Sequence, residues 1–297
     1  MQQAIEKANT LLEALQWIRE FSDKITVIKL GGSVMTNPVA LSRLLLDVVF
    51  METVGMYPVI VHGGGPSINR AMAEAGIQPK WVQGRRYTDP QTLAIVEKTL
   101  AYELNEQLAD QITILGGMAE PLNFRTHNVL FGQKLTLKDD EGAPVDLGQV
   151  GKVTRIDEGY IHYLCEHKHK IPVIPSLAIE EDAPAGSPGK LNVNADTAAT
   201  AVAQALGADK LVFLTDINGV RKDKNDPDTL IHSLDTAEAQ KLIDDHIVDA
   251  GMIPKIQACI ETVKKGVKQV HIVDGGIRHS LLLEVYTNCG IGTEIHR

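Results

Sequence analysis

The chain has 297 residues, of which 44% are hydrophobic and 23% are charged. A chain of this length can bury a large core in one domain or two lobes, so it needs neither a disulfide framework nor a structural metal. Its net charge of −9 disfavours general binding to a nucleic-acid backbone. Three cysteines without metal-ligand spacing indicate a reducing compartment. The sequence contains no apolar run of about 18 residues, which is the length that a membrane-spanning helix needs. We therefore expect a cytoplasmic protein that binds neither nucleic acid nor membrane.

Residues 1–22 predict an amphipathic helix rather than a targeting signal. Charged residues interrupt this segment, and its apolar stretches are too short for a signal peptide. Leu11, Leu15 and Ile18 follow helical spacing and give the helix an apolar face. That face can pack on the chain's own core or on a neighbouring subunit, and the sequence leaves both alternatives open.

Strand and helix patterns alternate along most of the chain, which is typical of an α/β fold with a largely parallel sheet. We expect strands at 25–30, 58–62, 171–175, 210–214 and 269–273, and helices at 38–54, 66–75, from 90 onward and at 195–206. Residues 121–161 alternate short apolar runs with turn clusters, which predicts hairpins at an edge of the sheet. A stretch rich in proline, glycine and serine at 183–189 is the expected boundary between two lobes.

Two predicted strands end in glycine clusters where a helix begins, and each junction can bind an anion. Gly31 and Gly32 follow the first strand, and residues 63–65 follow the second. Free N–H groups and the helix dipole converge at such a junction, and glycine lets the backbone approach a phosphate. Lys29 adds a cation to the first junction. A tight turn also explains each cluster taken alone, and neither matches a P-loop or the dinucleotide-binding pattern that would support an oxidoreductase.

Further polar residues lie at the predicted ends of other elements. Arg85 and Arg86 can bind a carboxylate in bidentate fashion, or they can be solvated surface arginines. Asn192, Asn194 and Asp196 precede a helix of small residues, where helix capping explains the amide and carboxylate side chains equally well.

The last third of the chain adds two features of the same kind. Residues 215–220 form a polar turn after a buried strand. Lys255 lies at the apolar start of another helix. A cation at that position opposes the helix dipole, which favours a functional role for the lysine.

The order of these motifs resembles the amino acid kinase family, and within it the members that phosphorylate N-acetyl-L-glutamate. The resemblance covers residues 25–295, and its motifs lie at 28–32, 61–66, 84–89, 192–196, 214–216 and 251–255. It implies a three-layer α/β/α sandwich with a mostly parallel central sheet. It also implies three parts, which are an oligomerising and regulatory helix at 1–22, a lobe at 23–185 that binds the amino acid and dimerises, and a nucleotide-binding lobe at 186–297.

The resemblance implies that MgATP phosphorylates the γ-carboxylate of N-acetyl-L-glutamate, a step of arginine biosynthesis. Lys29 and Lys255 would act on the transferring phosphoryl group, and Asp196 would orient both lysines. The residues implied to bind the substrate are Gly64, Gly65, Arg86 and Asn192. The residues implied to bind the nucleotide are Lys29, Gly31, Gly32, Thr215, Asp216, Val220 and Lys255. We expect Mg²⁺ to be held mainly by the phosphates and expect no metal site formed by protein side chains.

Regulation by L-arginine is a further hypothesis from the resemblance. In arginine-inhibited members an N-terminal helix interlaces dimers into a hexamer, and arginine binds between that helix and the C-terminal lobe. The matching residues of this chain are Trp17, Glu284, Gly290 and Gly292. Trp17 stands where those members usually have a tyrosine. We therefore expect a homo-oligomer, a dimer or a hexamer, that L-arginine inhibits.

Two alternatives remain open at this point. A sister kinase of the same family would act on another acid, such as an aminoadipate derivative, aspartate, glutamate or carbamate. A non-catalytic amino-acid sensor would keep the fold without turnover, although the presence of Lys29, Asp196 and Lys255 argues against it.

Overall fold

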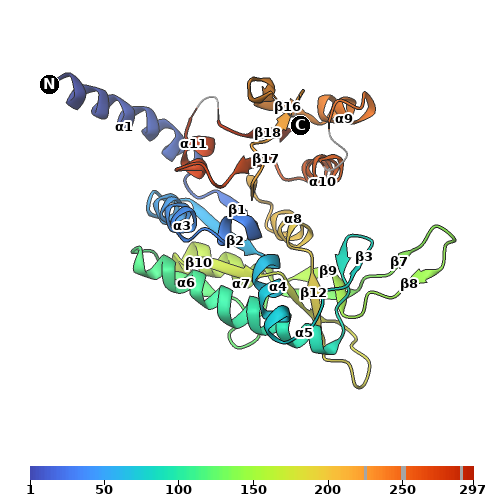
Figure 1. Ribbon diagram of the computed structural model, residues 1–297. Helices are drawn as coiled ribbons and strands as arrows, with labels where there is room; N and C mark the ends of the chain where they lie inside the picture. The colour runs from blue at the N-terminus through green and yellow to red at the C-terminus, as the bar shows by residue number, and fades with distance from the viewer. Residues whose placement is uncertain (224–225, 249–251, 288–289) are drawn as a thin grey trace.

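The computed structural model describes residues 1–223, 226–248, 252–287 and 290–297. Its centre is an eight-stranded sheet with the strand order β16-β18-β17-β13-β1-β2-β10-β5 (Figure 1). Every neighbouring pair is parallel except β17 and β18. The strands are β1 (Ile25–Leu30), β2 (Tyr57–His62), β5 (Ala119–Pro121), β10 (Ile171–Pro175), β13 (Lys210–Thr215), β16 (Ser233–Asp235), β17 (Gln269–Asp274) and β18 (Thr293–His296).

The two faces of this sheet are covered by separate helical layers. In β1, Val27 packs into one hydrophobic cluster and Ile28 into another, and Leu211 and Val212 of β13 divide in the same way. Because successive side chains of a strand point to opposite faces, both faces are buried. One layer contains α3 (Pro38–Thr53), α6 (Asn105–Ile114) and α11 (Ser280–Val285). The other contains α7 (Glu158–His162), α8 (Ala195–Ala205), α9 (Thr236–Asp244) and α10 (Ile253–Lys264). The predicted three-layer α/β/α sandwich is confirmed.

The five strands and the four helices predicted from the sequence are confirmed, with ends that differ by a residue or two in most cases. The helix at 66–75 is α4 (Gly65–Glu74). The helix that begins at Pro90 consists of α5 (Pro90–Glu97), a π-helical segment η1 (Lys98–Leu104) and then α6. Asp89 caps this helix, since its Oδ1 accepts the N–H of Thr92 at 2.7 Å. The π-helical segment was not predicted, because apolar spacing does not distinguish one wide turn inside a long helix.

The middle of the chain differs in part from the prediction. The short strands β7 (Leu137–Lys138) and β8 (Pro144–Val145) form the expected hairpin. However, β6 (Leu130–Lys134) and β9 (Val150–Ile156) do not extend the edge of the main sheet. They close into a separate four-stranded sheet with β11 (Leu177–Glu180) and β12 (Lys190–Val193). Local sequence patterns predict strands but not their distant partners, which explains the error.

Residues 183–189 connect β11 to β12, which pair antiparallel in this smaller sheet. The central sheet is continuous across the proposed lobes, because β1 pairs with β13. The division into lobes at 23–185 and 186–297 stays a prediction.

The predicted N-terminal helix is α1 (Gln2–Phe21), and it projects from the body of the molecule (Figure 1). Its last turn packs on the core, where the ring of Trp17 stacks on Phe21 and Phe21 contacts Tyr286 edge to face. Before that turn, the apolar side chains of Leu12 and Leu15 are 66% and 38% exposed. The side chain of Leu11 lies outside the described residues. Within the part of the chain described here, no helix has the length and apolar character needed to cross a membrane.

Candidate active site

The carboxyl ends of β1, β2 and β13 lie side by side, because the three strands are parallel neighbours. The short helix α2 (Gly32–Met35) begins directly after β1, and α4 begins after β2. The two junctions touch: a Cβ added to Gly32 would lie 2.6 Å from Pro66 Cδ. The N–H of Gly31 donates to the Leu214 carbonyl of β13 at 3.1 Å. The two glycine clusters therefore form a single site, as their positions after neighbouring strands require.

A lysine and an aspartate form an ion pair at this site. Lys29 belongs to β1, and Asp196 lies in the first turn of α8. The Nζ of Lys29 is 2.7 Å from Oδ1 of Asp196, and the side chains are 15% and 40% exposed. The pair is therefore only partly shielded from solvent. The carboxylate of Asp196 lies at the N-terminal end of α8, where the helix dipole favours a negative charge.

Lys255 reaches the same edge of the sheet from α10. Its Nζ donates to Oγ1 of Thr215, the last residue of β13, at 3.3 Å. Asp196 thus pairs with Lys29, while Lys255 contacts the neighbouring strand. The orientation of both lysines by Asp196 stays a prediction. Gly251 of the same motif lies outside the described residues.

A cavity of about 180 Å³ opens beside the second glycine cluster. It is lined by residues 63–65, by the hairpin of β3 (Trp81–Val82) and β4 (Arg85–Arg86), and by β12 with the residues that follow it. All four residues predicted to bind the substrate line this cavity: Gly64, Gly65, Arg86 and Asn192.

The Arg86 side chain is buried, so the alternative of a solvated surface arginine is wrong for this residue. Its Nη2 donates to Oδ1 of Asn69 at 2.6 Å, and its guanidinium lies 4.8 Å from the centre of the Trp81 ring. Burial lowers the pKa of Arg86 from its ordinary value, but a guanidinium keeps its charge in proteins. Asn69 and Trp81 are partners that the sequence analysis missed, and nothing in their spacing signals them.

The two asparagines before α8 have different roles. Asn194 caps the helix, because its Oδ1 accepts the N–H groups of Asp196 and Thr197 at 3.0 Å each. Asn192 belongs to β12, and its Nδ2 donates to Oγ1 of Thr88 at 3.1 Å. Both residues line the cavity, but the side chain of Asn194 is engaged in helix capping, whereas that of Asn192 is bonded to Thr88 across the cavity wall.

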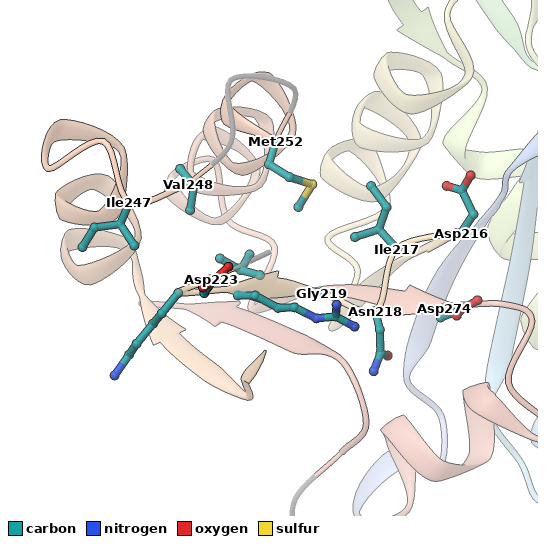
Figure 2. A pocket seen from close by; sticks show the side chains of 12 residues that line it. Asp216, Ile217, Asn218, Gly219, Asp223, Ile247, Val248, Met252 and Asp274 are labelled. Atoms are coloured by element: carbon teal, nitrogen blue, oxygen red, sulfur yellow. The ribbon is translucent and has the colours of Figure 1, made fainter. Parts of the chain in front are cut away.

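A larger cavity, of about 610 Å³, lies beyond the ends of β13 and β17. Figure 2 shows Asp216, Asn218 and Asp274 on the sheet side, with Ile247, Val248 and Met252 across from them. The predicted residues Asp216 and Val220 line it, and the Val220 N–H is fixed by a 2.7 Å bond to Oγ1 of Thr293. Ligand pockets commonly combine apolar walls with a few polar groups. The apolar residues before and at the start of α10 were missed, because they read as ordinary helix-packing residues.

The predicted regulatory residues Glu284, Gly290 and Gly292 lie together at the end of the chain. Oε1 of the buried Glu284 is 2.8 Å from Nδ1 of His271, and Oε2 accepts the N–H groups of Ile291 and Gly292 at 2.8 Å each. Gly290 is close enough that an added Cβ would lie 2.8 Å from Oε2. Burial by itself raises the pKa of Glu284, but His271 and the two N–H groups outweigh burial and hold this pKa below its ordinary value.

Another cavity, of about 720 Å³, lies where α1 meets the last third of the chain. Glu20, Phe21 and Lys24 line it from the N-terminal side. Asp209, Lys268, Gln269, Glu294 and His296 are among its remaining lining residues. Trp17 lies one helical turn before Phe21 on α1. This cavity therefore combines residues of the N-terminal helix with carboxylates of the C-terminal third.

Comparison with solved structures shows a shared fold. The N-acetylglutamate synthase from Neisseria gonorrhoeae, in complex with coenzyme A and L-arginine, has a TM-score of 0.78 and 24% identity. The match covers 97% of this chain and 65% of the synthase. Carbamate kinase from Giardia lamblia bound to AMP-PNP has a TM-score of 0.60 and 18% identity, over 93% of this chain and 99% of that kinase.

Comparison of sequences goes further. The model of the amino acid kinase family matches residues 24–274. The acetylglutamate kinases of Heliobacterium modesticaldum and Methanothermobacter thermautotrophicus are 42% and 41% identical to the chain. These matches cover 99% and 98% of this chain, and 99% of each relative. The chain therefore belongs to the amino acid kinase family, in which these full-length relatives are acetylglutamate kinases.

Proposed function

We propose that the protein transfers the γ-phosphoryl group of ATP to the γ-carboxylate of N-acetyl-L-glutamate. The observation that carries this proposal is the convergence of Lys29, Lys255 and the two glycine junctions at the carboxyl edge of β1, β2 and β13. One cavity opens beside the second glycine cluster, and another lies beyond the end of β13. The similarity to acetylglutamate kinases over the full chain supports the choice of substrate. The product is an acyl phosphate in amino-acid biosynthesis, which for this substrate is arginine biosynthesis.

The chemistry needs alignment and charge neutralisation rather than a base. The acceptor is a carboxylate that is already ionised, so no proton has to be removed before it attacks phosphorus. Lys29 and Lys255 would neutralise the equatorial oxygens of the transferring group, and Gly32 would donate its N–H group. The N–H of Gly31 is bonded to the Leu214 carbonyl, so Gly31 would contribute by letting the backbone approach the phosphates closely. Asp196 would hold Lys29 in place through the 2.7 Å ion pair. Mg²⁺ enters with ATP and is held mainly by the phosphates.

The cavity of about 180 Å³ beside the second glycine cluster suits the acetylated amino acid. The buried guanidinium of Arg86 would bind a substrate carboxylate, and its 2.6 Å bond to Oδ1 of Asn69 shows that it donates to an oxygen in this setting. Asn192 would bind the amide, while Gly64 and Gly65 bring the backbone close to the substrate. The nucleotide would occupy the cavity of about 610 Å³ beyond the ends of β13 and β17, beside Asp216 and Val220.

The proposed division into lobes follows from the resemblance to the amino acid kinase family. Residues 23–185 would bind the amino acid and dimerise, and residues 186–297 would bind the nucleotide. The three cysteines without metal-ligand spacing support a cytoplasmic location.

The first test is ATP-dependent acyl-phosphate formation, trapped with hydroxylamine. N-acetyl-L-glutamate, free glutamate, aspartate, carbamate and aminoadipate are compared at equal concentration. We expect turnover with N-acetyl-L-glutamate alone, because Arg86 and Asn192 offer partners to both a carboxylate and an amide. Preference for another acid would identify a sister kinase. Folded protein that binds ATP but turns over none of the acids would support the sensor.

The second test replaces the two lysines separately. Lys29→Ala and Lys255→Ala should each lower kcat by about 100- to 1,000-fold, because each removes a charge that stabilises the transferring group. Lys264→Ala is the matched control, since Lys264 lies in the last turn of the same helix as Lys255. Circular dichroism would verify folding. Unchanged turnover in either variant would remove that lysine from the mechanism.

The third test concerns the substrate arginine. Arg86→Lys keeps a positive charge but loses the planar fork, so it should raise KM for N-acetyl-L-glutamate by about 10- to 100-fold. KM for ATP should stay constant, because the nucleotide cavity is separate. Arg85→Lys, on the less buried neighbour in the same hairpin, should have a much smaller effect. An equal effect of the two substitutions would contradict the assignment of Arg86.

We further propose that the enzyme is a hexamer that L-arginine inhibits. The exposed Leu12 and Leu15 on the projecting α1 supply an apolar face for a neighbouring subunit. The cavity between α1 and the last third of the chain would hold the inhibitor, with Glu20 and Glu294 near its positive charge and Trp17 in the adjoining core. The buried Glu284 belongs to α11, whose next residue, Val285, packs in the same core.

The fourth test separates assembly from folding. Leu12→Glu combined with Leu15→Glu should shift the mass in solution from hexamer to dimer and remove inhibition by millimolar arginine, because charges would enter the apolar contact. Gln16→Glu, at an exposed polar position of the same helix, should preserve both properties. Sedimentation and initial rates are the measurements. A wild-type enzyme that is dimeric and insensitive to arginine would overturn this proposal without affecting the kinase activity.

A further inference from the structure

A chain of hydrogen bonds between buried side chains ends at the second glycine cluster. Nδ1 of His62, the last residue of β2, is 3.0 Å from the Gly63 carbonyl. Nε2 of the same ring is 3.1 Å from Nδ2 of Asn105 on α6. Asn105 is bonded in turn to Asn123, because Nδ2 of Asn123 donates to Oδ1 of Asn105 at 3.1 Å. His62, Asn105 and Asn123 are all 0% exposed, and none of them was singled out in the sequence analysis.

The direction of every bond in this relay follows from its fixed partners. The Val173 carbonyl can only accept, so the Asn105 group 2.8 Å from it must be the amide NH₂. That same NH₂ faces Nε2 of His62, which must therefore accept. The Gly63 carbonyl also can only accept, so the ring proton must lie on Nδ1. His62 is thus held as the neutral Nδ1–H tautomer.

The remaining members of the relay are equally determined. Nδ2 of Asn123 donates to the Ala101 carbonyl at 2.9 Å, and its Oδ1 accepts the N–H of Arg125 at 2.9 Å. Burial lowers the pKa of His62 to about 4, while the bond to Gly63 acts in the opposite direction. The ring therefore stays neutral near pH 7, as both of its neutral partners require.

The π-helical segment η1 explains how α6 can take part. The N–H of Asn105 bonds to the Leu100 carbonyl, five residues back, instead of the Ala101 carbonyl four residues back. The Ala101 carbonyl accepts instead from Asn123. The segment also forms a platform under the glycine cluster: a Cβ on Gly64 would lie 2.6 Å from Leu100 Cδ2 and 2.5 Å from Leu104 Cδ1.

The Gly63 carbonyl and the Gly64 N–H belong to the same planar peptide group and point in opposite directions. A bond that fixes the carbonyl therefore also fixes the direction of the N–H. Glycine has no side chain to restrict its backbone, so without such a bond this peptide group could rotate more freely. Gly64 lines the proposed substrate cavity, which places the fixed peptide group at the site of reaction.

We propose that His62 is a positioning residue, held by the Asn105–Asn123 relay, which orients the Gly63–Gly64 peptide so that the Gly64 N–H faces the reacting groups. This inference rests on the proposed function and deepens it. His62 takes no proton from the substrate. It acts only through the Gly63 carbonyl, and the π-helical platform limits the movement of Gly64 from the other side.

Two substitutions separate the ends of the ring. His62→Asn places an amide NH₂ near the position of Nδ1, so it can keep the bond to the Gly63 carbonyl while losing the bond to Asn105. His62→Gln places its amide group near the position of Nε2, so it can keep the bond to Asn105 while losing the bond to the Gly63 carbonyl. We expect kcat of His62→Asn to fall by about 3-fold and that of His62→Gln by about 30- to 100-fold, because small errors in alignment are costly. KM for ATP should not change in either variant, since the nucleotide cavity is separate.

Equal losses of kcat in the two variants, or a larger loss in His62→Asn, would mean that the ring acts through packing alone and would overturn the proposal. The wild-type protein supplies a second measurement that needs no turnover and no variant. Its ¹⁵N-histidine NMR spectrum should show the ring of His62 as the Nδ1–H tautomer, neutral from pH 5.5 to 8. His271 is a second buried histidine, so the signal is assigned by its loss in His62→Asn or, if that variant does not fold, in His62→Gln.

An Nε2–H tautomer, or titration of that ring near pH 6.5, would also overturn the relay. Because the spectrum is independent of substrate, it tests the relay even if the hydroxylamine assay identifies a different acid. Failure of the relay and failure of the proposed function are therefore distinguishable.

Discussion

The parallel pairing of β1 with both β2 and β13 is the constraint on which the proposed site depends. Parallel strands end at the same edge of a sheet, so three loops that are far apart in the sequence meet there. The helices that follow these strands direct their first turns to the same edge. Lys29, the two glycine clusters and Thr215 owe their proximity to this pairing. A one-residue shift of strand register would turn Lys29 toward the opposite layer.

The arrangement of charge follows from this geometry. The chain carries a net charge of −9, yet its proposed reaction brings an anionic nucleotide to an anionic acid. Lys29, Arg86 and Lys255 supply a local cationic region at the edge of the sheet. Asp196 compensates part of that charge through its ion pair with Lys29, and the partial exposure of the pair keeps the cost of desolvation low. Arg86 is buried more deeply, and its contacts with Asn69 and Trp81 hold the guanidinium in place.

Much of the fold could be predicted because the relevant signals are local. Short and nearly continuous apolar runs define the central strands, and Asp89 with Pro90 marks a helix start that the structure shows. The partners of β6 and β9 could not be predicted, since strand pairing depends on contacts with β11 and β12 many residues away. The π-helical turn escaped prediction for another reason. It changes the backbone bonds of Asn105 without changing the apolar pattern of the helix.

The sequence by itself determined the family, the alternation of strands and helices, and which residues carry charge or lack a side chain. The motifs are short and contiguous, so their order along the chain is sufficient for these conclusions. Only the tertiary structure decided that Arg86 is buried, that Asn194 caps a helix while Asn192 bonds to Thr88, and that Asp196 pairs with Lys29. It also decided that His62 is bonded to an asparagine 43 residues away. Burial and long-range hydrogen bonds arise when distant elements pack together, and no local pattern encodes that packing.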